Sequence, residues 1–106
     1  MRSENINDTA LDINNIFSWN LSGWSRYEKV IKLNLSNNKI QIINGDFCKS
    51  LPNVEFIDLR ANKIVEISPQ IRLMVSIQII KLDKNELTSL PDEIFDIKLI
   101  EELTFQ

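Results

Sequence analysis

The stretch VIKLNLSNNKIQII, from Val30 to Ile43, decides how this chain folds. Its apolar residues and one asparagine form a pattern of six positions that occurs three times. Val54 lies 24 residues after Val30, and Ile77 lies 23 residues after Val54. A period in this range indicates a repeat architecture, in which stacked units share one core. The three copies are Val30, Leu33, Leu35, Asn38, Ile40, Ile43; Val54, Ile57, Leu59, Asn62, Ile64, Ile67; and Ile77, Ile80, Leu82, Asn85, Leu87, Leu90.

Each position of the pattern has a physical role. Leu33 and Leu35 are two residues apart, so a short strand points both to the same buried face. The asparagine follows where the chain turns away from the strand, and its amide offers both donors and acceptors to backbone groups. We therefore predict a ladder of Asn38, Asn62 and Asn85 that satisfies buried peptide groups.

This pattern resembles that of the leucine-rich repeat family, LxxLxLxxNxL at about 20–29 residues. The resemblance covers roughly residues 27–105. It implies an α/β solenoid curved like a horseshoe. A short parallel sheet would form the concave face, and loops or short helical turns would form the convex face. It also implies an adaptor, regulatory or effector role that depends on binding another protein.

The repeats divide a single domain, residues 1–106. The clear repeats span about 27–50, 51–73 and 74–96, and a partial repeat spans 97–106. Two interpretations of residues 1–26 stay open. Stepping back 24 residues gives a degenerate repeat, with Ile6, Thr9, Leu11, Asn14, Ile16 and Trp19 in the six positions. Helical spacing instead gives a capping helix, with Ile13, Ile16, Phe17, Leu21 and Trp24 on one side.

The convex side is predicted from the apolar residues between the copies. Asn44-Gly45 indicates a turn. Pro52, Pro69 and Pro91 interrupt regular structure. We expect Phe47, Leu51, Ile94 and Phe95 to point into the core. The same is expected of Ile71, Leu73, Met74 and Val75, with a small exposed patch as the alternative.

Charge and cysteine content narrow the partners and the compartment. The formal net charge is −3, whereas nucleic acids and anionic membranes attract clustered Lys and Arg. We therefore expect neither a nucleic acid nor a membrane as the partner. No apolar run is long enough to span a membrane, and the polar start of the chain does not resemble a secretory signal. Cys48 is the only cysteine, which fits a reducing compartment. We expect a cytoplasmic protein, or an effector secreted into a host cell.

Residues that carry out catalysis are scarce. The chain has no histidine, one cysteine and two glycines. A His-based triad, a His or multi-Cys zinc site and a glycine-rich phosphate loop are therefore excluded. Acidic residues are scattered, and acid pairs such as Glu101-Glu102 are typical of a solvated surface. We predict no catalytic residue, no metal, no cofactor and no enzymatic activity.

A binding surface can be derived from the strands. Residues that alternate with the buried positions point to the concave, solvent-facing side. Phe56 and Ile79 are apolar residues side by side there, and apolar patches in such places mark contact sites. The charged residues around them either contact the partner or pair across strands. The predicted partner-binding residues are Lys32, Asn34, Ser36, Phe56, Asp58, Arg60, Ile79, Lys81, Asp83 and Glu102.

Two functions follow. The first is a protein–protein interaction module that uses the concave face. The alternative is a structural role, in which the C-terminal edge from Leu103 to Gln106 docks against a second copy and forms a homo-oligomer.

Overall fold

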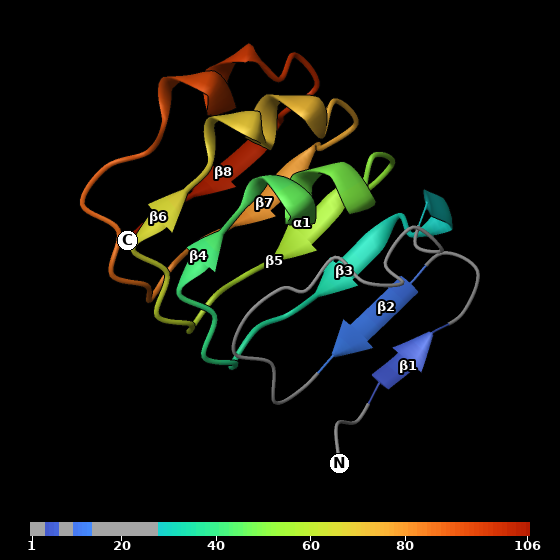
Figure 1. Cartoon of the computed structure of the whole chain (residues 1–106), viewed down its shortest axis with the longest axis horizontal. Helices are drawn as coiled ribbons and strands as arrows, with labels where there is room; N and C mark the ends of the chain where they lie inside the picture. Colours follow the sequence, from blue (N-terminus) through green and yellow to red (C-terminus); the bar gives the residue numbers. More distant parts are fainter. Residues whose placement is uncertain (1–3, 7–9, 14–27) are drawn as a thin grey trace.

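In the computed structural model, which describes residues 4–6, 10–13 and 28–106, a sheet forms one layer and the helices form the other (Figure 1). The six-stranded sheet has the order β1-β2-β3-β5-β7-β8. All neighbours are parallel except the antiparallel pair β1 and β2. The strands are β1 (Glu4–Ile6), β2 (Ala10–Ile13), β3 (Lys32–Asn34), β5 (Phe56–Asp58), β7 (Ile79–Lys81) and β8 (Glu102–Thr104).

The repeat sets the register of the sheet. Leu33 lies opposite Ile57, Ile57 opposite Ile80, and Ile80 opposite Leu103. These residues point towards the helical layer, and the first three are fully buried. All six positions of the first two copies are buried, whereas in the third copy Asn85, Leu87 and Leu90 are half-buried. One continuous core thus runs through the stacked repeats, as the pattern predicts.

The asparagines form a hydrogen-bonded ladder between repeats. Asn62 Nδ2 donates to Leu59 O and to Leu35 O of the preceding repeat, both at 3.0 Å. Asn62 Oδ1 accepts from Ile40 N at 3.0 Å. Asn85 repeats this geometry one turn later: it donates to the carbonyls of Leu59 and Leu82 and accepts from Ile64 N. Asn62 and Asn85 therefore each join their own turn to the repeat before it, and Asn38 Nδ2 donates within its own turn to Leu35 O at 2.8 Å.

A left-handed residue precedes each ladder asparagine. Asn37, Ala61 and Lys84 have φ values of 60°, 58° and 61°. This conformation turns the chain out of the strand, and Asn tolerates it better than Ala or Lys does. The turn thus has the same geometry in three repeats, although the residue at this position differs.

The helical element of the outer layer is not the same in all repeats. It contains the α-helix α1 (Gly45–Ser50) and the 3₁₀-helices η2 (Pro69–Leu73) and η3 (Asp92–Asp96). Asn44 Oδ1 accepts from Phe47 N, so the predicted Asn44-Gly45 turn is an N-cap that begins α1. A second sheet consists of two parallel strands, β4 (Ile42–Ile43) and β6 (Glu66–Ile67). In the sequence, β4 comes between β3 and α1, and β6 comes between β5 and η2.

Part of the prediction for the convex side was wrong. Phe47, Leu51, Ile71, Met74 and Ile94 are buried as expected. Leu73, Val75 and Phe95, however, are 45%, 61% and 66% exposed. A 3₁₀-helix has three residues per turn, so it directs only positions i and i+3 to one side. Ile71 with Met74, and Ile94 with Ile97, take those positions and leave the other apolar residues outside.

The register of β2 also differs from the prediction. The 24-residue step aligned Leu11 with Leu35, whereas β2 pairs with β3 so that Leu11 lies opposite Leu33. A shift of two residues keeps the inward and outward alternation of a strand, so the apolar pattern alone does not detect it. The remaining positions that separate a degenerate repeat from a capping helix, residues 14–27, lie outside the described part.

Candidate functional site

The concave face is the side of the sheet that points away from α1, η2 and η3. The strand pairing arranges its side chains into rows that run across β3, β5, β7 and β8. The ten residues predicted to contact a partner lie in these rows, and their contact with a partner stays a prediction. The upper row is Lys32, Phe56, Ile79 and Glu102; the middle row is Asn34, Asp58, Lys81 and Thr104; the lower row is Ser36, Arg60, Asp83 and Gln106.

An apolar pair occupies the centre of the upper row. Phe56 and Ile79 lie directly opposite each other on β5 and β7, and both are half-buried. Lys81 Nζ lies 5.7 Å from the centroid of the Phe56 ring, within the range of a cation–π interaction. Lys32 and Glu102 end the row and are exposed. The row therefore runs from a cation, through two apolar side chains, to an anion.

Asp58 and Arg60 form an ion pair along one strand. Arg60 donates from Nε to Asp58 Oδ1 at 2.9 Å and from Nη2 to Asp58 Oδ2 at 2.7 Å. Asp58 also accepts from the Arg60 backbone N at 3.1 Å. Asp58 was predicted to face solvent, where its charge would contact a partner or pair across strands; instead, Asp58 is only 5% exposed and pairs with the residue two positions later. Residues i and i+2 share a strand face, which brings the groups together.

The ion pair fixes the charge of both groups. Burial of Asp58 would raise its pKa, but hydrogen bonds from the Arg60 side chain and backbone, with the positive charges of Arg60 and Lys81, lower it overall. The side-chain hydrogen bonds to Asp58, and then the negative charge of Asp58, raise the pKa of Arg60. The guanidinium is therefore held in one orientation, with its outer edge free to face a partner.

The equivalent turns in the other repeats use different chemistry. In the first repeat Asn34 Oδ1 accepts from Ser36 N at 3.0 Å and from Ser36 Oγ at 2.7 Å. In the third repeat this position is Lys81, which has no acceptor. Within the described residues, Asp83 Oδ1 and Thr104 Oγ1 are buried atoms without a hydrogen-bond partner. On the concave face, the hydrogen bonding of polar side chains is thus least complete over β7 and β8.

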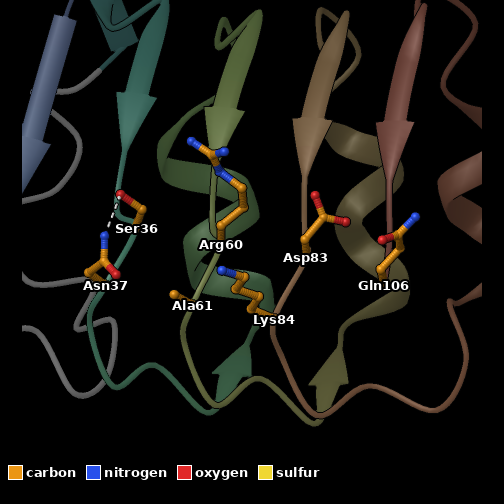
Figure 2. Close-up of a pocket in the computed structure, with 7 residues that line it drawn as sticks. All are labelled: Ser36, Asn37, Arg60, Ala61, Asp83, Lys84 and Gln106. Atoms are coloured by element: carbon orange, nitrogen blue, oxygen red, sulfur yellow. Dashed lines mark hydrogen bonds between the residues drawn. The ribbon is translucent and has the colours of Figure 1, made fainter.

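A hollow of about 440 Å³ opens at the lower row, where the strands end (Figure 2). Four successive repeats contribute to its lining: Ser36, Asn37, Arg60, Ala61, Asp83, Lys84 and Gln106. Asn37, Ala61, Lys84 and Gln106 were predicted to lie on the concave side, but they were not among the residues predicted to contact a partner. The three left-handed turns place the first three of them there. Their position immediately before each ladder asparagine is the sequence signal that would have identified them.

Chemical groups suited to catalysis are not gathered in the described part of the chain. No cluster of three or more His, Cys, Asp or Glu side chains that could hold a metal occurs there. Cys48 is fully buried in α1, and burial raises the pKa of its thiol to about 12, which disfavours a nucleophilic thiolate. A search of these same residues also finds no helix able to cross a membrane.

Comparisons with known proteins agree with the repeat geometry. The family model described as leucine rich repeat matches residues 10–64. Asporin of Bos taurus is 32% identical over 78 residues, which are 74% of this chain and 21% of asporin. The solved structure of a leucine-rich repeat protein from Leptospira interrogans superposes with a TM-score of 0.76 at 28% identity, covering 88% of this chain and 24% of that chain. The predicted solenoid fold is confirmed, and the chain spans about a quarter or less of these relatives.

Proposed function

The chain belongs to the leucine-rich repeat family, and we propose from this membership and from its surface that it is a protein-binding module whose concave face contacts a partner protein. Members of this family commonly act as protein–protein interaction modules. The partner's identity follows from neither the family nor the fold.

The observation that carries the proposal is the Phe56–Ile79 pair. Both side chains are only half-buried although they lie in the middle of a four-strand array, not at its edge. Apolar side chains surrounded by a polar rim are typical of the energetic centre of an interface. The rim here consists of Lys32, Lys81 and Glu102, and the oriented Arg60 guanidinium follows the end of β5.

The test is an affinity capture with identification of the retained proteins by mass spectrometry. The variant Phe56→Ala/Lys32→Glu removes the ring and reverses an exposed charge in the same row. Lys32 is preferable to Arg60 because replacing Arg60 would leave the buried Asp58 carboxylate without its counter-ion. Both substituted side chains lie outside the core, so we expect the variant to fold.

A matched control comes from the convex side. Phe95→Ala/Lys98→Glu makes the same two chemical changes at exposed residues in and after η3. We expect a partner that is retained by the wild type and the control and lost by the concave variant. Equal retention by all three folded proteins would contradict binding through the concave face.

A second candidate function is self-association through β8. Its support is that Leu103 and Phe105 are half-buried whereas Ile57 and Ile80 are fully buried. Partly exposed apolar side chains of this kind are suited to contact with a second copy. This candidate requires dimers that form with increasing concentration and dissociate on Phe105→Glu, measured by sedimentation; a monomer at all concentrations would contradict it.

A further inference from the structure

We infer that the concave face binds an amphipathic α-helix of the partner that lies across the strands, with an acidic side chain over β3 and β5 and a basic side chain over β7 and β8. This inference rests on the proposed function and specifies the chemistry of the partner. It is carried by the distribution of charge over the face and by the spacing of the rows.

Positive charge gathers over β3 and β5. Lys32 is exposed on β3, and Arg60, two residues after the end of β5, is exposed and paired with the buried Asp58. Lys81 belongs to β7, but its ammonium lies over the Phe56 ring of β5. Figure 2 shows the Lys84 side chain pointing from its own turn towards Ala61, in the turn after β5.

Negative charge remains over β7 and β8. Asp83 follows β7, and its Oδ1 has no donor within the described residues. Glu102 is exposed on β8, opposite Ile79. The only acidic side chain of these rows over β3 and β5 is Asp58, which is buried and bonded to Arg60. Both the upper and lower rows therefore change from positive to negative in the same direction along the solenoid.

The spacing of the upper row selects a helix over an extended segment. Neighbouring strands are about 4.8 Å apart, so Lys32 and Glu102 lie three spacings, or about 14 Å, apart. Side chains at i and i+3 or i+4 of a helix are separated by about 5–6 Å and project from one side. Same-side residues of an extended strand are about 6.7 Å apart, so they do not stay aligned with strands that are about 4.8 Å apart. About ten helical residues, with a rise of 1.5 Å each, cover the row.

The experiment begins with a displayed library of helical peptides of about twelve residues, a length set by the helical rise, selected at low ionic strength against the wild-type chain. We expect enriched peptides to carry an acidic residue, two apolar residues and a basic residue at successive i+3 or i+4 positions. Binding should be lost on Phe56→Ala, which separates peptides on the concave face from those bound elsewhere.

Charge reversal then locates the two ends of the peptide. Replacing its acidic residue with Lys should weaken binding to the wild type and be rescued by Lys32→Glu but not by Glu102→Lys. Replacing its basic residue with Glu should show the opposite rescue. We expect each rescue to be about five-fold, the upper range for an exposed ion pair, and Lys98→Glu on the convex side to rescue neither.

The outcomes separate the two proposals. Peptides that require Phe56 but lack the end charges, or that show no matched rescue, would overturn the inference and leave the concave interaction site intact. Peptides that bind Phe56→Ala as well as the wild type, or the absence of any enriched peptide, would count against both.

Discussion

The inner half of each repeat hardly changes along the chain, whereas the outer half varies in length and in the type of helix. The inner half runs from the first apolar position to the ladder asparagine, residues 30–38, 54–62 and 77–85. It contains a three-residue strand and a left-handed turn each time. The outer half contains an α-helix of six residues once and 3₁₀-helices of five residues twice.

The difference shows where the fold is constrained. Strand pairing and the asparagine ladder connect one inner half to the next, so an extra residue there would break both. The outer halves need only cover the core. Six α-helical residues extend about 9 Å and five 3₁₀ residues about 10 Å. The single extra residue of the first repeat, which makes its period 24 instead of 23, is therefore accommodated between Asn38 and Val54.

The largest expected contrast is between leucines of the two halves. Leu59, on the inner side, is 1% exposed, and Leu73, at the end of η2, is 45% exposed. Leu59→Ala should lower the free energy of unfolding by about 2–5 kcal/mol because it leaves a cavity in a packed core. Leu73→Ala should change it by about 0.5 kcal/mol at most. Equilibrium denaturation with urea measures both, and similar losses would show that the outer layer is as constrained as the inner one.

A smaller contrast is expected between two asparagines. Asn62→Ala removes the partner of two buried carbonyls and one backbone amide, and should cost about 1–3 kcal/mol. Asn44→Ala removes one N-cap hydrogen bond of α1 and should cost about 1 kcal/mol. The same denaturation experiment compares them. If Asn62→Ala unfolds at the urea concentration of the wild type, the ladder contributes nothing and strand pairing alone aligns the repeats.

The same division explains which parts of the fold could be predicted. The inner half has a fixed length, so Leu33, Ile57 and Ile80 identify both the strands and their register. The outer half has no such repeat. An apolar residue such as Phe95 looks identical in sequence whether a 3₁₀-helix turns it inward or outward. The β2 register was missed because a two-residue shift leaves the strand alternation unchanged.

The concave face could be predicted in outline but not in its polar details. Alternation along each strand is sufficient to place Phe56 and Ile79 side by side. It does not reveal that Asp58 is buried by its own neighbour, because exposure depends on how the Arg60 side chain folds back. The hollow depends on three left-handed turns, whose places are marked by the ladder asparagines that follow them but whose conformation the residue types Asn, Ala and Lys do not indicate.

The smallest expected effect tests how strongly the inner geometry overrides local preference. Ala61 adopts φ 58°, a conformation that costs a residue with a Cβ atom about 1–2 kcal/mol relative to glycine. Ala61→Gly relieves this strain but adds entropy to the unfolded chain. We therefore expect the free energy of unfolding to rise by about 0.5–1 kcal/mol.

The control for that substitution is Lys63→Gly, at an exposed residue in the same repeat that does not have a positive φ. There glycine adds entropy to the unfolded chain and relieves no backbone strain, so we expect the free energy of unfolding to fall by about 0.5–1 kcal/mol. Opposite signs at residues two positions apart would mean that the ladder and the strand pairing hold Ala61 in a conformation its side chain disfavours. A loss at both positions would mean that the turn is unstrained, and that the inner half is constant because its residues prefer that geometry.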